Sequence, residues 1–184
     1  MILIQQTCLE ADGPTMKYHM NNFACKFNSK GNGKDLAHYF TSKFESVHDI
    51  AEDMFQMSKL ESKHYDIISV YRSSDSSEIN QIVFCQRLIG MINMRKKTII
   101  MGDFNLNVID DKSNIISEEL FKLGFRQLVK EPTHIYGGII DHCYISQDIS
   151  PSRVKLNQKS VYYTDHDMLE IQYATEDECS TPVR

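Results

Sequence analysis

Short apolar runs separated by polar turns dominate the chain, and this pattern is typical of β-strands. The runs at 65–71 and 98–101 are rich in β-branched residues and are the clearest strand candidates. Weaker runs predict strands at 1–7, 139–145 and 168–173 and an edge strand within 36–47. The polar segment from 8 to 39 is expected to hold loops and short strands.

Two segments show the periodicity of helices instead. Residues 78–94 follow a polar turn with a serine cap at 73–77, and residues 116–123 end at Gly124. The longer helix is predicted to bury one stripe, composed of Ile79, Ile82, Val83, Leu88, Ile89 and Ile92. Strands that alternate with helices indicate an α/β domain, in which sites form at strand ends.

Length and composition limit the possibilities. With 184 residues, 41% of them hydrophobic, we expect one domain over 1–175 and a flexible tail over 176–184. The net charge of −5 argues against a protein that holds nucleic acid by bulk positive charge. It does not exclude a nuclease, because acidic metal ligands make an active site negative until the metal binds.

Cysteine usage and hydropathy bear on location. The five cysteines are scattered and odd in number, which favours reduced thiols over disulfides or a zinc site. No apolar stretch is long enough to span a bilayer, and the first residues are too few for a signal sequence. We therefore expect a soluble intracellular protein, nuclear or cytoplasmic, that has no membrane partner and is not secreted. The oligomeric state stays open.

The first candidate for chemistry is Gly102-Asp103-Phe104-Asn105, directly after an apolar run. Asp103 and Asn105 occupy alternate positions, so their side chains leave the strand end on one face. A carboxylate beside an amide can bind a metal, orient a water or contact a phosphoryl oxygen. An Asp and an Asn after a strand also commonly do no more than turn the chain.

Two later motifs favour the functional interpretation. Asp141 follows an apolar run, and Asp165-His166 offers two side chains that point in different directions from one turn. Asp141 is the candidate partner that fixes the imidazole of His166 and stabilises its protonated form. An isolated Asp-His pair is usually solvated, but the joint occurrence of Asp103 with Asn105, Asp141-His142 and Asp165-His166 beside apolar runs indicates a site for attack on a phosphodiester.

Together these motifs resemble the endonuclease/exonuclease/phosphatase family, which has the deoxyribonuclease I-like fold. The family's GDFN, IDH and SDH motifs have counterparts here in the same order at 102–105, 140–142 and 164–166, with threonine in place of the serine at 164. Segments 68–73 and 122–133 resemble the branch found in non-long-terminal-repeat retrotransposons. The resemblance is good over 65–173 and loose over 2–47. It implies an α/β fold with a two-layered β-sandwich flanked by helices.

The resemblance also implies roles for individual residues. It places an attacking water beside Asp103, the scissile phosphate beside Asn105 and protonated His166, and Asp141 behind His166. Asp165 is implied as a metal ligand, with Mg²⁺ as the expected ion and Mn²⁺ possible. Near the substrate it implies the residues Tyr71, Arg72 and Thr133, although a tyrosine at a strand end is often simple packing and a threonine after proline is often a turn residue.

Three departures from the family pattern matter. Gln6 stands where a glutamate is the principal metal ligand, so the site keeps an oxygen ligand but loses a charge. The family's first strand has no counterpart, so the domain is expected to be truncated at its N-terminus. His134 replaces an expected arginine and weakens a phosphate contact. An alignment with Glu10 as the ligand puts that residue beyond the strand end, and we do not favour it.

The sequence therefore leaves three functions open. The first is a Mg²⁺-dependent phosphodiesterase, an endonuclease of retrotransposon descent that nicks DNA, which the late motifs favour. The second is a degenerate, weak or inactive domain kept as a binding module, which Gln6 and the missing strand favour. The third is a phosphatase of a nucleotide or an inositol phosphate, since loops set the substrate in this fold.

Overall fold

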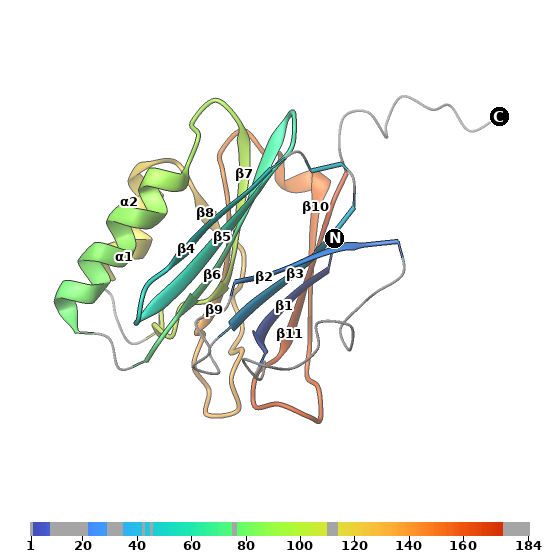
Figure 1. The fold of residues 1–184 in the computed structure, drawn as a ribbon. Helices are drawn as coiled ribbons and strands as arrows, with labels where there is room; N and C mark the ends of the chain where they lie inside the picture. The colour runs from blue at the N-terminus through green and yellow to red at the C-terminus, as the bar shows by residue number, and fades with distance from the viewer. Residues whose placement is uncertain are drawn as a thin grey trace.

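Two layers of β-sheet pack face to face, and helices cover the outer face of one layer (Figure 1). The computed structural model describes residues 2–7, 22–28, 35–41, 43–44, 46–74, 77–109 and 114–174. The predicted tail at 176–184 and Glu10 lie outside these residues. Neither helix in the described ranges is long and apolar enough to cross a membrane.

The larger layer is a six-stranded sheet with the order β4-β5-β6-β7-β9-β8. β6 and β7 run parallel, and all other neighbours in this sheet are antiparallel. Its strands are β4 (Ser46–Ala51), β5 (Phe55–Glu61), β6 (Tyr65–Arg72), β7 (Lys97–Asp103), β8 (Arg126–Gln127) and β9 (Asp141–Ile145).

The second layer consists of two smaller antiparallel sheets, one with the order β1-β3-β2 and one formed by β10 and β11. Figure 1 shows both on the face of the large sheet that lies away from the helices. A buried hydrogen bond from the Leu36 amide to Gln56 Oε1, 3.1 Å long, joins the layers. The strands are β1 (Ile2–Thr7), β2 (Ala24–Asn28), β3 (Asp35–Phe40), β10 (Val154–Lys159) and β11 (Met168–Tyr173), and a short 3₁₀ helix, η2 (Pro151–Arg153), precedes β10.

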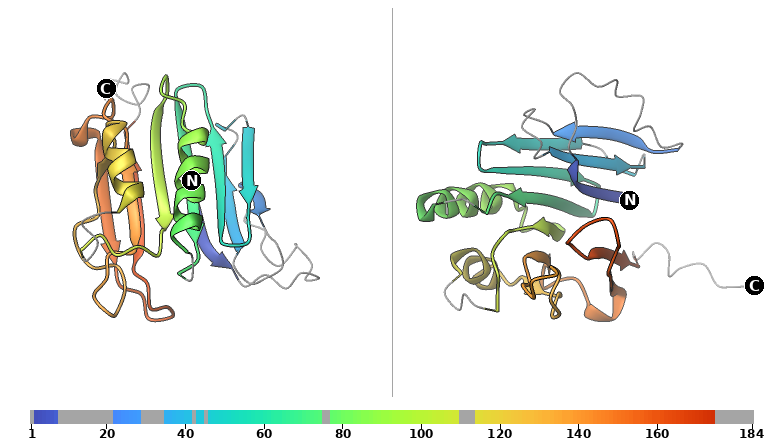
Figure 2. Two further views of the ribbon diagram at one scale, coloured as in Figure 1. Left: turned by 90° about the vertical axis from the view of Figure 1, so that its left-hand side faces the viewer. Right: turned by 90° about the horizontal axis from the view of Figure 1, so that it is seen from below.

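The central strand β7 contributes side chains to a hydrophobic core on each face of the large sheet. Ile100 points toward the helices, whereas Ile99 and Met101 pack toward β10 and β11. This alternation is the period of two that a strand imposes on its side chains. The helices α1 (Glu78–Met91) and α2 (Ile115–Lys122) run side by side over the core that contains Ile100 (Figure 2).

Helix α1 begins where the sequence predicted, with Ser77 as its N-cap, and it buries only part of the predicted stripe: Leu88 is buried, and Val83, Ile89 and Ile92 are partly buried against the core. The buried residues are Phe84, Cys85, Leu88 and Met91. Ile79 and Ile82, which were predicted to be core, are 72% and 39% exposed. The aromatic ring of Phe84 decides the orientation, because it packs edge to face on Phe55 and Phe104.

The single edge strand predicted within 36–47 is wrong. The segment contains β3, which is the central strand of its sheet, and the start of β4, which is an edge of the other sheet. Strands β5 and β10 were not predicted either. The strands predicted at 65–71 and 98–101 and the shorter helix before Gly124 are confirmed by β6, β7 and α2.

We predict that Phe104→Ala lowers the free energy of unfolding by about 3–5 kcal/mol, because the ring is fully buried and leaves a cavity. Phe104 contacts the rings of Phe84, His142 and Tyr144. Phe121→Ala is the matched control, since Phe121 is 76% exposed and should cost less than about 0.5 kcal/mol. Urea denaturation measures both, and equal losses would contradict the assignment of the core.

Candidate functional site

Pairing of β7 with β9 builds the floor of the candidate site. Asp103 is the last residue of β7 and Asp141 the first of β9, and the antiparallel register sets them opposite each other. Both residues are buried, at 2% and 6% exposed. The ladder continues one step further, where the Phe104 amide donates to the Ile140 carbonyl over 2.9 Å. Two carboxylates predicted from separate motifs therefore lie together.

Asn105 holds the carboxylate of Asp103 from the turn after β7. Its backbone N–H donates to Asp103 Oδ1 over 2.9 Å, and its side-chain Nδ2 donates to Oδ2 over 2.8 Å. Asn105 adopts φ of 47°, a left-handed conformation that asparagine tolerates better than most residues. The conformation folds the amide back onto Asp103 and fixes its rotamer.

Arg72 lies beneath this turn and is 2% exposed. Its Nε donates to the Phe104 carbonyl over 2.6 Å, and its Nη2 donates to the Asn105 carbonyl over 2.7 Å. In return, Asn105 Nδ2 donates to the Arg72 carbonyl over 2.7 Å. The sequence predicted that Arg72 binds substrate, but its position supports a different role, because a buried guanidinium committed to two carbonyls holds the turn in place.

His166 completes the cluster from the loop between β10 and β11. Its Nδ1 donates to Asp141 Oδ2 over 2.9 Å. This hydrogen bond, opposed by partial burial and helped by the charges of Asp141 and Asp103, raises the pKa of His166 to about 9. The imidazole is therefore protonated at neutral pH, and Asp141 stands behind it as the sequence predicted.

Burial raises the pKa of Asp103 to about 7, and the negative charge of Asp141 adds to the effect. The positive charge of His166, the hydrogen bond from the Asn105 amide and the charge of Arg72 oppose the rise. Asp103 can therefore exchange a proton near neutral pH, which is the property required of a general base.

Thr133 supports Asp141 from below. Its hydroxyl oxygen accepts hydrogen bonds from the amides of Ile140 and Asp141, at 3.2 and 3.1 Å, and the residue has no exposed surface. The predicted contact between Thr133 and the substrate backbone does not fit such a hydroxyl. Tyr71 is 6% exposed and pairs with Asp103 in the parallel register of β6 and β7. Its predicted contact with phosphate stays a prediction.

Asp167 anchors the loop that carries Asp165 and His166. Its carboxylate accepts hydrogen bonds from Gln158 Nε2 and Ser160 Oγ, each 2.8 Å long, and its amide donates to the Thr133 carbonyl over 2.7 Å. A backbone bridge between His134 and His166 ties the same loop to the segment before β9. No local pattern in the sequence predicted this anchoring, because the backbone contacts join the loop to a segment more than 30 residues earlier in the chain.

Asp165 is the exposed carboxylate of the cluster, with 55% of its side chain accessible. A hydrogen bond from its own backbone N–H, and then the nearby charge of His166, lower its pKa. His134 Nε2 lies 3.3 Å from Asp165 Oδ2, and its ring meets that of His166 edge to face at 4.9 Å. In the sequence, His134 was noted only because the family that the chain resembles has an arginine at that position. The structure brings His134 into the site.

Two overlapping groups of side chains have the donor atoms to hold a metal ion. One is Asp103, Asp141 and His166, and the other is His134, Asp165 and His166; within each group the donor atoms lie within 4.8 Å of one another. Gln6 belongs to β1, but its side chain lies outside what the structure describes, so its place in the metal site stays a prediction.

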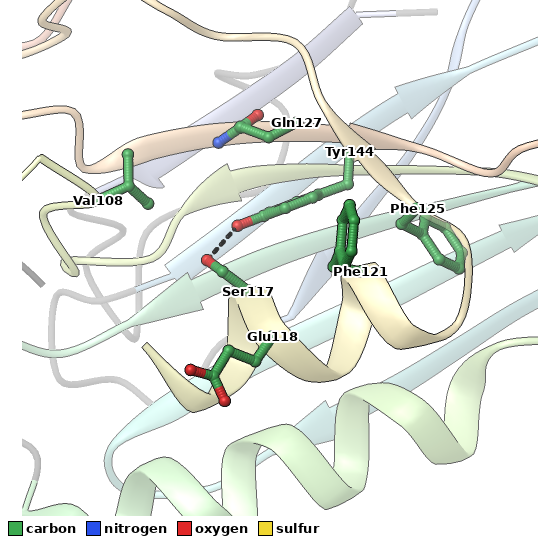
Figure 3. A pocket seen from close by; sticks show the side chains of 7 residues that line it. All are labelled: Val108, Ser117, Glu118, Phe121, Phe125, Gln127 and Tyr144. Carbon is green, nitrogen blue, oxygen red and sulfur yellow. Dashed lines mark hydrogen bonds between the residues drawn. The ribbon is translucent and has the colours of Figure 1, made fainter. Parts of the chain in front are cut away.

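An apolar hollow of about 320 Å³ lies apart from this chemistry, between α2 and the sheet (Figure 3). Within it, Ser117 Oγ and Tyr144 Oη share a hydrogen bond of 2.7 Å. Tyr144 Oη also lies 3.2 Å from Nδ1 of the buried His142. The hollow contains none of the predicted site residues; it is lined by Val108, Ser117, Glu118, Phe121, Phe125, Gln127 and Tyr144.

We predict that Asp141→Asn moves the pKa of His166 down from about 9 toward the ordinary value of 6.5, because it removes the charged acceptor. The folded protein holds a proton between these values that the unfolded chain releases. The pair thus stabilises the fold fully below pH 6.5, and this contribution disappears as the pH rises through about 9.

Imidazole NMR titration and urea denaturation of chelator-treated protein test the point. Between pH 6.5 and about 9, the free energy of unfolding should fall in the wild type and should fall less in Asp141→Asn. Asp148→Asn, beyond the far end of β9, is the matched control and should leave the titration of His166 unchanged. Titration of His166 at the same pH in both proteins would contradict the assigned pair.

Comparison with known proteins identifies the fold. No family model matches the chain, and no curated protein matches it. Solved structures do match the chain. An AP endonuclease from Archaeoglobus fulgidus aligns with a TM-score of 0.72 and 16% identity over 94% of this chain and 88% of its own. The endonuclease domain of TRAS1, a telomere-specific non-LTR retrotransposon, aligns with a TM-score of 0.63 and 16% identity over 84% and 79%.

Cytolethal distending toxin from Actinobacillus actinomycetemcomitans aligns with a TM-score of 0.64 and 11% identity over 93% of this chain and 80% of its own. At such low identities the similarity establishes the fold alone. The layered sheets, the flanking helices and these alignments agree with the architecture that the motifs predicted. The chain therefore has the deoxyribonuclease I-like fold of endonuclease/exonuclease/phosphatase proteins.

Proposed function

We propose that the chain is a metal-dependent phosphodiesterase that nicks DNA. The observation that carries the proposal is the cluster of Asp103, Asp141 and His166, whose donor atoms lie within 4.8 Å of one another at one end of β7 and β9. The cluster combines a carboxylate that titrates near neutral pH with an imidazole that is protonated there. Together they provide a base for water and a cation for phosphate.

In the proposed reaction, Asp103 takes a proton from a water molecule as the water oxygen bonds to phosphorus. The bond from phosphorus to the leaving sugar oxygen breaks at the same centre; its electron pair stays on that oxygen, which takes up a proton from solvent and leaves as a hydroxyl. His166 donates a hydrogen bond to a phosphoryl oxygen through the nitrogen that does not face Asp141. Asn105 keeps Asp103 oriented, and Asp141 keeps His166 oriented and charged.

The residues present fit a divalent cation of the Mg²⁺ type. Asp165 offers an exposed, ionised carboxylate, which is the oxygen ligand that such ions prefer. Gln6 is proposed as a second oxygen ligand. The cation, when bound, neutralises charge on the phosphate; Mg²⁺ is the expected ion, and Mn²⁺ accepts the same ligands.

DNA as the substrate is supported by similarity rather than by the site itself. Two of the structures with this fold are described as endonucleases, the AP endonuclease and the TRAS1 domain. The net charge of −5 implies weak nonspecific affinity for DNA, so binding is expected to depend on contacts near the cluster. Descent from a retrotransposon is consistent with the TRAS1 alignment and stays a proposal.

We predict that the purified protein nicks supercoiled plasmid in Mg²⁺ or Mn²⁺, and that Asp103→Asn and His166→Ala each reduce the rate by at least roughly 100-fold. Matched controls are Asp148→Asn, beyond the far end of β9, and His48→Ala, and both should keep the wild-type rate. Circular dichroism confirms folding. If the wild-type protein nicks no plasmid in either metal, the proposal that the chain is a metal-dependent nuclease is refuted.

An inactive binding module is the second candidate, and Gln6 is the observation that favours it. We predict that Gln6→Glu raises the affinity for Mg²⁺, seen as a larger increase in Tm on adding the metal and a faster nicking rate. Gln5→Glu is the control, because it adds the same charge one position away in β1. If the two variants respond alike, residue 6 is not part of the metal site.

A further inference from the structure

We propose that His134, Asp165 and His166 form a second metal site that selects Zn²⁺ and switches off the proposed nuclease. The three donor atoms lie within 4.8 Å of one another on the open side of the cluster. Two nitrogens and one carboxylate oxygen suit zinc better than magnesium, which prefers oxygen ligands only. The inhibitory part rests on the proposed function; the binding part does not.

The spacing of His134 and Asp165 matches two ligands of one tetrahedral ion. Zinc bonds of about 2.0–2.1 Å at the tetrahedral angle separate two ligand atoms by about 3.3–3.4 Å. His134 Nε2 and Asp165 Oδ2 are 3.3 Å apart. A charge-assisted hydrogen bond is usually shorter, about 2.7–2.9 Å, so the pair has the separation of two ligands rather than of a strong ion pair.

His166 contributes the third ligand through its second nitrogen, Nε2, and zinc must first displace the proton that this nitrogen carries in the charged imidazole. Because its Nδ1 donates to Asp141, the neutral ring carries its lone pair on Nε2. A carboxylate behind a histidine ligand is the usual arrangement at zinc sites, where it fixes the tautomer and strengthens the bond to metal. The backbone bridge between His134 and His166 holds the two rings side by side before any ion arrives.

Binding has an identifiable cost at His134. Its Nδ1 accepts a hydrogen bond from the Tyr136 amide at 3.3 Å, and ligation through Nε2 places the ring proton on Nδ1 instead. The lost contact is long and Tyr136 is exposed, so water can satisfy its amide. The ion reaches the ligands from solvent, since the side chains of His134, His166 and Asp165 are 15%, 20% and 55% exposed.

Zinc in this position blocks the proposed reaction through the residues that it occupies. A neutral, ligated His166 no longer donates to phosphate, and Asp165 is withdrawn from Mg²⁺. Three protein ligands leave a fourth position for water or for a phosphate oxygen, so the zinc form can still hold a substrate that it does not cleave.

The test is zinc binding to chelator-treated full-length protein, followed by calorimetry and by the visible absorption of Co²⁺ as a zinc substitute. We expect His134→Ala to weaken binding by at least roughly tenfold. His48→Ala is the matched control, because His48 Nε2 also faces a carboxylate oxygen, Glu61 Oε2 at 3.4 Å, but belongs to neither metal-ligand group. It should bind zinc like the wild type.

Equal zinc affinity in wild type and His134→Ala would overturn the site, as would an equal loss in His48→Ala. Binding through cysteines would survive in His134→Ala and therefore also counts against it. In the nicking assay with Mg²⁺, the wild type should be inhibited by zinc at lower concentration than His134→Ala. If the protein proves inactive, the proposed function fails, but the zinc affinities of the wild type and the variants still test the zinc site. Failure of the proposed function is therefore distinguishable from failure of the zinc site.

Discussion

The antiparallel register of β7 and β9 is the constraint on which the site depends, because it buries Asp103 opposite Asp141. Two carboxylates in one buried place repel each other, and burial alone already disfavours the charged forms. The pKa of Asp103 rises to about 7 for these two reasons. The arrangement is tolerable because Asp141 is paired with a cation, His166, whose own pKa rises to about 9 in return. Repulsion in one direction and attraction in the other thus produce a base and an acid from neighbouring groups.

Hydrogen bonds from buried residues hold these groups where the strand register puts them. Arg72 ties down the turn after β7 through two carbonyls, and Thr133 accepts from the amides at the start of β9. Asp167 does the same for the loop of His166 by joining it to the Thr133 carbonyl. Arg72 and Asp167 link segments more than 30 residues apart, whereas Thr133 accepts from amides only seven and eight residues further along the chain. These hydrogen bonds fix the floor of the site, while the side chains of Asp165, His166 and His134 reach solvent.

Local patterns in the sequence located the central strands, and the resemblance carried by the motifs supplied the two-layered fold and the expected cluster. Apolar runs located β6, β7 and β9, and the motifs beside them supplied Asp103, Asp141 and His166. Prediction failed where tertiary contacts decide. Helix α1 keeps Leu88 in the core as predicted but buries Phe84 and leaves Ile79 exposed, because the ring of Phe84 packs on Phe55 and Phe104. Arg72 and Thr133 were expected at the substrate; both are buried and hydrogen-bonded to backbone, and their contact with substrate stays a prediction. Nothing in the residue types distinguishes a threonine that touches a ligand from one that caps two amides.

The supporting role of these residues changes what the motifs can establish about activity. A chain that had lost catalysis would still need Arg72, Asn105 and Thr133 to fold the turn and the strand start, so their presence follows from stability alone. Activity must be judged at positions with no such duty. There the chain departs in one direction: residue 6 offers a neutral amide instead of a carboxylate, and residue 134 offers an imidazole instead of a guanidinium. In the proposed function, both changes would weaken the binding of Mg²⁺ and phosphate, and in the proposed zinc site the second supplies a nitrogen ligand. The preference of this cluster among metal ions is therefore the property by which we propose to separate a working nuclease from a domain with a different use.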